Sequence, residues 1–289
     1  MSGDGLVRKT LRDQRGMTIG MSIAGFLVAM LIIALYPQFA DQFAEIELPD
    51  IYDALFGEVA FAEPAGFIAA EYFGWFPLLV IAIAVIAGTA SIASEEGNGT
   101  LELLLAEPVT RRALILRKTV GLAASIAIIC AVSYAGLVAG RLMIADFDLG
   151  YLPLFDATVL MLLISWFFLG LSILGSALFP GRMSAAITVT ALIVIAYFSN
   201  IAASLVDGLS FLEHAQPFGW ADYPATILDG LQVLESALLL GFALAFVAAA
   251  VWSFERREIG AVGWPRLRPR VTREAPHAAA KGEGARAGE

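Results

Sequence analysis

The chain is poor in the residues from which most catalytic and metal sites are built. It has a single cysteine, Cys130, and only His214 and His277 as histidines. One cysteine excludes a disulfide within the chain, and neither histidine stands in a spacing typical of a zinc or Ser-His-Asp site. The sequence also lacks the G-x-x-x-x-G-K-[ST] phosphate-binding loop. We therefore expect no catalytic residue, no metal site and no cofactor bound by this chain.

Charge is scarce too, and it is missing from six long stretches. Asp, Glu, Lys and Arg make up 16% of the chain, whereas 59% is hydrophobic. A stretch of about 20 apolar residues is long enough to cross a bilayer as a helix. The stretches are Met17–Tyr36, Phe73–Ala93, Val120–Gly140, Ala157–Phe179, Ser184–Val206 and Ser236–Phe254. The sequence thus predicts an all-α, polytopic membrane protein with six transmembrane helices.

The charge-free stretches argue against a proton- or sodium-coupled transporter. A charged residue at the bilayer centre costs about 2.5–3.5 kcal/mol on insertion scales, so the charges that are kept there usually mark ion pathways. Energy for transport would then have to come from outside the membrane. The polar residues left in the stretches are small, and helix packing is the commoner role for them. The alternative is a substrate path, for which the candidates are Ser165, Thr188, Thr190, Ser199 and Asn200.

Basic residues lie almost entirely on one side of these stretches. Of the 18 Lys and Arg residues, only Arg141 falls on the other side, where most of the acidic residues lie. Cytoplasmic loops carry the excess of basic residues, so we expect both termini in the cytoplasm. The expected location is the plasma membrane. The acidic outer face could attract cations, but scattered charges more often form a solvated surface. The lipid bilayer is an expected partner, and nucleic acid is not.

The membrane domain, residues 17–255, is flanked by two short cytoplasmic segments. Residues 1–16 mix Leu and Val with basic residues, which fits either a short amphipathic helix at the membrane surface or a disordered tail. Residues 256–289 are rich in Pro, Arg, Ala and Gly, and this composition predicts a basic, disordered tail.

Two longer segments are expected on the outer side. Residues 37–72 read as a loop with Pro37 as a helix breaker and a short helix at Ile51–Val59. Residues 207–235 read as a re-entrant or interfacial piece, because aromatic residues favour the membrane interface. The two aromatic anchors would be Trp220 and Tyr223.

The loop between the second and third stretches, residues 94–119, carries a short helix of its own. Gly97 and Gly99 permit a sharp turn, Thr100 can cap a helix and Pro108 can end it. Thr110 is placed to cap the helix that follows. The Leu-rich turn between these signals is too short to span the membrane. From spacing alone, it could lie on lipid or insert into a groove of a cytoplasmic partner.

Residues 96–111, EGNGTLELLLAEPVTR, resemble a signature of ABC-2 type transporter permeases. That signature reads approximately E-x-G-T-L-E-x-L-L-[SA]-x-P-[VI]-[ST]-R, and Asn98 is an extra residue relative to it. The match is most similar to the subgroup that contains maturation permeases of nitrous oxide reductase. The acidic, Ala- and Gly-rich composition also resembles that of proteins from salt-adapted archaea.

The resemblance implies the permease subunit of an ABC exporter. Such a subunit pairs with a second copy or a paralogue and docks a cytoplasmic ABC ATPase, which binds ATP and Mg²⁺, through a coupling helix. By this resemblance the ATPase-contacting residues are Glu95, Glu96, Gly99, Thr100, Leu101, Glu102, Leu103, Leu104, Leu105, Pro108 and Arg111. The alternative is a membrane scaffold or signalling partner of an ABC-type ATPase that transports nothing. The sequence names no substrate.

Overall fold

A computed structural model describes residues 3–43, 63–93, 110–144, 146–179 and 181–256, which all belong to one packed unit. The secondary structure of these residues is helical, without a strand. The expected helix Ile51–Val59, most of the coupling segment and the tail from residue 257 lie outside the described residues.

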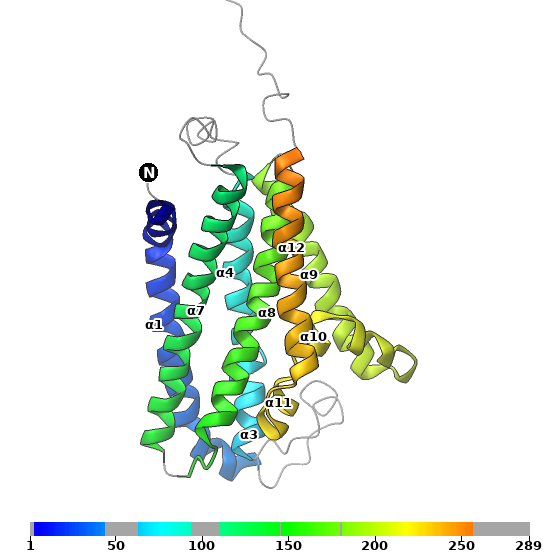
Figure 1. Ribbon diagram of the computed structural model, residues 1–289. Helices are drawn as coiled ribbons and strands as arrows, with labels where there is room; N and C mark the ends of the chain where they lie inside the picture. The colour runs from blue at the N-terminus through cyan, green and yellow to red at the C-terminus, as the bar shows by residue number, and fades with distance from the viewer. Residues whose placement is uncertain (1–2, 44–62, 94–109, 145, 180, 257–289) are drawn as a thin grey trace, which may run out of the picture. The chain divides into compact units, whose positions relative to one another are not determined.

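Six helical segments of the described chain are long and apolar enough to cross a membrane, which confirms the six predicted spans. Figure 1 shows them running side by side. The second span is built from three elements in succession, α3 (Pro64–Ile68), the π-helix η1 (Ala69–Phe73) and α4 (Phe76–Ala90). The other five are α1 (Gly3–Phe43), α7 (Arg111–Met143), α8 (Tyr151–Leu178), α9 (Arg182–Leu205) and α12 (Val233–Arg256).

The first helix, α1, extends beyond its charge-free stretch in both directions. It begins at Gly3, so the N-terminal segment is helical, and Figure 1 shows its darkest-blue turns nearly end-on above the turns that cross the bundle. It also passes through Pro37, so the prediction of a break there is wrong. A proline removes one helical hydrogen bond. Here the adjacent Tyr36 packs edge-on against Phe67 and Phe147, at 5.4 and 5.2 Å between ring centroids, and holds these turns in place.

The second span begins at Pro64, inside the segment that the sequence assigned to the outer loop. Because Glu71 is charged, the charge-free stretch begins only after it, and the sequence therefore placed the start of this span too late. In the structure Glu71 is exposed, while Phe67, Ile68 and Tyr72 around it are buried. A helix can carry one outward-facing carboxylate without interrupting its apolar face, so charge alone misplaced this boundary.

The fourth span, α8, lies at the centre of the packing. In its most apolar stretch 72% of the residues are buried, compared with 28% in α12 and 11% in α9. It packs against α4, α7, α9 and α12, whereas α1 packs chiefly against α7. The helix α9 therefore presents most of its apolar surface to the surroundings of the described chain.

Small residues set how closely the spans approach one another. A Cβ atom added to Gly136 of α7 would lie 2.7 Å from the Cα of Phe26 in α1, and one added to Gly140 would lie 2.9 Å from the Cβ of Ile33. Both glycines thus face α1, as expected for a small-xxx-small pair. On the other side of the bundle, a Cβ on Gly170 of α8 would lie 2.6 Å from the carbonyl oxygen of Ala243 in α12.

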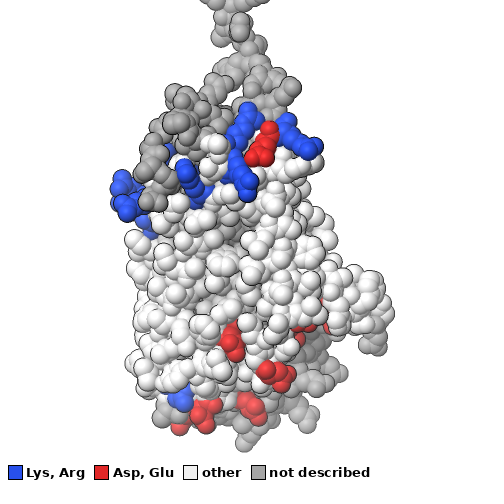
Figure 2. Space-filling view, in the orientation of Figure 1, with Lys and Arg blue, Asp and Glu red and all other residues white. Residues whose placement is uncertain are grey.

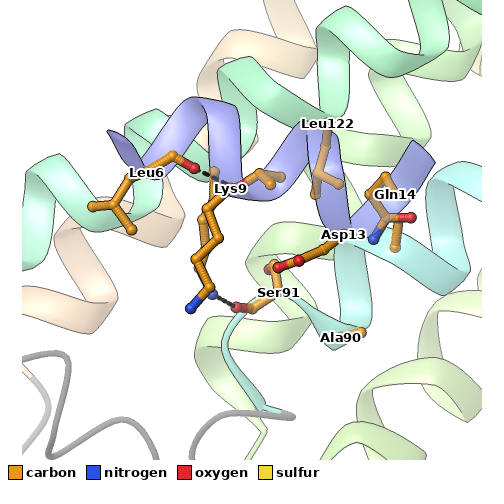
Figure 3. A pocket seen from close by; sticks show the side chains of 10 residues that line it. Leu6, Lys9, Asp13, Gln14, Ala90, Ser91 and Leu122 are labelled. Carbon is orange, nitrogen blue, oxygen red and sulfur yellow. Dashed lines mark hydrogen bonds between the residues drawn. The ribbon is translucent and has the colours of Figure 1, made fainter. Parts of the chain in front are cut away.

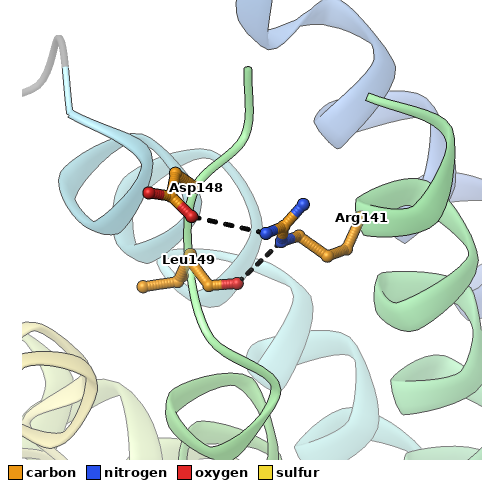
Figure 4. A network of polar contacts seen from close by, with 3 residues as sticks. All are labelled: Arg141, Asp148 and Leu149. Carbon is orange, nitrogen blue, oxygen red and sulfur yellow. Dashed lines mark hydrogen bonds and ion pairs between the residues drawn. The ribbon is translucent and has the colours of Figure 1, made fainter. Parts of the chain in front are cut away.

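Charges gather at the two ends of the spans. Figure 2 shows Lys and Arg near one end, where α7 begins and α12 stops, and most Asp and Glu near the other. We call these the basic end and the acidic end. Arg141 is the exception that the sequence identified, and it lies at the acidic end of α7 (Figure 4). Its guanidinium donates to the carbonyl of Leu149 at 2.9 Å and contacts the Asp148 carboxylate at 3.4 Å, so it ties α7 to the start of α8.

The second outer segment folds back onto the acidic half of the bundle. It contains the 3₁₀-helix η2 (Asp207–Ala215), α10 (Pro217–Trp220) and α11 (Tyr223–Asp229). The ring of Trp220 stacks on Phe242 of α12 at 5.6 Å, and that of Tyr223 stacks on Phe73 at 5.2 Å. Both expected anchors therefore pack on spanning helices rather than point away from them.

We expect Gly136→Ala to destabilise the protein by about 1–3 kcal/mol, because the added methyl group meets backbone atoms of α1 that cannot move aside alone. Gly20→Ala on α1 is the matched control, since a Cβ there meets nothing within 4 Å. Thermal unfolding of both variants in detergent measures the difference. Equal midpoints for the two would show that the α1–α7 seam is not as close as described.

Candidate functional site

The candidate site is the base of the loop between α4 and α7, at the basic end. The structure describes the chain up to Ala93 and again from Thr110. Of the predicted ATPase-contacting residues it therefore describes Arg111, and the others lie outside the described residues. The described contacts show how the two ends of this loop are fastened to the spanning helices.

Ser176 of α8 fastens the end that follows α4. Its hydroxyl oxygen accepts hydrogen bonds from the backbone N–H groups of Ile92 and Ala93, both at 3.0 Å, and donates to the carbonyl of Thr89 at 3.0 Å. Ser176 is fully buried. The last carbonyl groups of a helix and the buried N–H groups just beyond its end need partners, and this one side chain serves three such groups.

The close fit of α4 against α8 places Ser176 within reach. One turn earlier, a Cβ added to Gly88 would lie 2.6 Å from the Cβ of Ser172. The absence of a side chain at Gly88 thus lets the two backbones approach near Ser176. We call the three hydrogen bonds of Ser176 to the end of α4 the clamp. The hydroxyl of Ser172 itself donates to Phe168 within α8 at 2.6 Å, so it plays no part in the clamp.

Lys118 and Arg111 fasten the end that leads into α7. The ammonium group of Lys118 donates to the carbonyl of Ser91, which joins α7 directly to the end of α4. The guanidinium of Arg111 donates to the carbonyl of Phe254 in α12 at 3.3 Å and lies 5.8 Å from the centre of its ring. Thr110 caps α7 as the sequence predicted, because its hydroxyl accepts from the N–H of Ala113 at 3.2 Å.

These contacts make the loop base a junction of four spanning helices. The chain on one side is held by α4 and α8, and on the other by α7 and α12. A force on the intervening residues would therefore reach several spans together. The described side chains of the junction act by hydrogen bonding to backbone carbonyl and N–H groups at the ends of the spanning helices. Among the described residues, no group of three or more His, Cys, Asp or Glu could hold a metal ion.

Sequence reasoning missed Ser176, Ser91 and Lys118 as parts of this junction. Ser176 is a small polar residue inside the charge-free stretch Ala157–Phe179, and it lies 84 positions from Ile92. No local spacing connects residues so far apart, and only the packing of α8 on α4 brings them together. Lys118 could have been found, since it is a basic residue next to a charge-free stretch, where a lysine reaches for polar atoms at the membrane interface.

The five substrate-path candidates have different surroundings. Ser165 is buried in α8, and its hydroxyl donates to Met161 of the same helix at 2.7 Å. The other four lie on α9, where Thr190 is exposed and the side-chain amide of Asn200 lies 2.9 Å from that of Gln216. The described contacts do not single out one path through these residues.

In the part of the chain that the structure describes, five buried hydroxyl groups make no hydrogen bond of normal geometry, namely those of Ser22, Tyr72, Ser133, Tyr223 and Ser236, although those of Tyr72 and Ser133 lie close enough to interact with each other. Burial raises the pKa of Tyr223 well above its ordinary value, so its hydroxyl remains a donor. The sequence singled out Tyr223 only as an interfacial anchor, and it did not single out Tyr72, which lies inside the predicted outer loop 37–72.

We expect Ser176→Ala to loosen the end of α4, because it leaves the N–H groups of Ile92 and Ala93 buried without a partner. Such a loss costs about 1–3 kcal/mol, and exchange of these two amides should quicken at least fivefold. Hydrogen–deuterium exchange of the purified protein measures it. Ser165→Ala is the control, because that buried hydroxyl bonds only within α8. Unchanged exchange at residues 92 and 93 would contradict the clamp.

Comparison with known proteins adds one match. The model of the family described as ABC-2 family transporter protein matches residues 7–259, from the first spanning helix to the last. No curated protein matches the chain.

Proposed function

The chain belongs to the family of ABC-2 transporter proteins, and we propose that it is a permease subunit driven by a separate cytoplasmic ATPase. The family consists of membrane-embedded transport subunits, which agrees with six apolar helices and a multi-pass membrane location. One observation supports the coupling in particular. Both ends of the loop that resembles a coupling helix are hydrogen-bonded to spanning helices, through Ser176, Lys118 and Arg111.

In this proposal the partner ATPase binds ATP and Mg²⁺ and supplies the energy, while this chain supplies the path. The Leu-rich segment 101–105 docks into a groove of the ATPase. Closure of the ATPase pushes on the loop, and the push reaches α8 through Ser176 and α12 through Arg111. A second copy or a paralogue completes the transporter.

The proposed direction is export across the plasma membrane, with both termini in the cytoplasm. The separation of charges supports this orientation, since Lys and Arg gather at the end that carries the coupling loop (Figure 2). The six charge-free stretches support an external energy source, because Asp, Glu, Lys and Arg are absent from them. The structure adds Glu71 to the second span, but its side chain is exposed at the surface of the described bundle.

Paired substitution of Leu103→Asp and Leu104→Asp should abolish binding of the ATPase, because two carboxylates would enter an apolar groove. The tagged chain is purified in mild detergent from its own cells, and copurifying nucleotide-binding subunits are identified by mass spectrometry. Recovery of the ATPase should fall at least tenfold relative to the wild-type protein.

The control is Leu142→Asp with Met143→Asp, which places the same two charges at the acidic end of α7, where these side chains are 71% and 67% exposed. This variant should retain the ATPase. A folded Leu103/Leu104 variant that keeps the partner would refute docking through this helix. If the wild-type chain captures no ATPase, the coupled permease is refuted and a different membrane role takes its place.

A further inference from the structure

A hollow at the basic end lies between the first turns of α1 and the ends of α4 and α7 (Figure 3). Its volume is about 190 Å³, well above the roughly 10–15 Å³ that a cavity needs, on the same measure, to hold one water molecule. Among the residues that line it are Leu6, Lys9 and Asp13 of α1, Ser91 after α4, and Lys118 and Leu122 of α7.

The positions of the lining residues along the chain suit the depth of lipid headgroups. Each wall comes from a place where a charge-free stretch meets polar sequence: residue 14 precedes the stretch 17–36, Ser91 lies near the end of 73–93, and Lys118 precedes 120–140. The first turns of α1 cross the bundle here and close the hollow on one side. Leu6 is buried, so the amphipathic segment is anchored through its apolar face.

The chemistry of the lining suits a phosphate group with hydroxyl groups beside it. Lys9 and Lys118 supply two ammonium groups, and Lys118 also donates to the Ser91 carbonyl, which fixes its position. Ammonium groups bind phosphate oxygens through charge-assisted hydrogen bonds. The carboxylate of Asp13 can accept from headgroup hydroxyls, while Leu6 and Leu122 offer apolar contacts to the glycerol and upper acyl carbons.

We propose that this hollow binds the phosphate of an anionic phospholipid whose headgroup carries hydroxyl groups. The hollow contains none of the proposed ATPase-contacting residues. Lipid binding there would therefore not require the ATPase. Because Lys118 belongs both to the hollow and to the junction at the loop base, a bound lipid holds α1, α4 and α7 together at that point.

The test uses the purified full-length chain in detergent, titrated with phosphatidylglycerol and observed by native mass spectrometry. Lys9→Gln with Lys118→Gln should weaken the tightest binding step about tenfold or more, because each lysine near the headgroups contributes attraction. Arg12→Gln with Arg15→Gln is the matched control. It removes the same two charges from exposed positions of α1 that do not line the hollow, and binding should change less than twofold.

Other arms separate the sources of phosphate and guard against misfolding. Phosphatidylcholine should bind at least tenfold more weakly, and inorganic phosphate should not displace the anionic lipid. Equal weakening by the arginine pair would overturn the site in favour of diffuse charge attraction, and displacement by inorganic phosphate would overturn the lipid. Lys9→Gln alone provides a second variant, since the side chain of Lys9 is exposed and its loss should still weaken binding without unfolding the protein.

Discussion

The constraint that governs this structure is that apolar helices must hold together in a solvent that is itself apolar. Burial of apolar surface contributes little between helices in lipid, so close backbone contact must supply the cohesion. The chain meets this requirement with glycine: Gly136 lies against α1, Gly88 against α8, and Gly170 of α8 against α12. Two of these three contacts involve α8, which is also the most buried of the six spans.

Close contact also decides where polar groups can be placed. A helix that ends near the membrane surface leaves backbone groups that lipid cannot satisfy. At the end of α4 these groups meet Ser176, which is within reach because Gly88 allows α8 so near. The seam that gives the bundle its cohesion therefore also fixes one end of the loop base. This is a physical reason for a loop at this position to move with the helices rather than independently of them.

The sequence predicted the features that depend on local composition. The six spans follow from missing charge, and the cap at Thr110 follows from residue type beside a helical pattern. It failed where a distant contact decides the outcome. The helix continues through Pro37 where Tyr36 packs on Phe67 and Phe147, and the clamp at Ser176 joins helices far apart in the chain. The assignment of residues 95–108 as ATPase contacts rests on the resemblance of the sequence motif.

The junction and the hollow meet at Lys118, and this meeting has a thermodynamic consequence. If the loop base has two arrangements during a transport cycle, a lipid in the hollow can favour one only by binding the two with different affinity. Lys118 supplies such a difference, because its ammonium group donates to the end of α4 and lines the hollow at once. Movement of α4 away from α7 would change the lipid's surroundings. By linkage, the free energy by which the movement changes lipid affinity equals the free energy by which the bound lipid favours or opposes the movement.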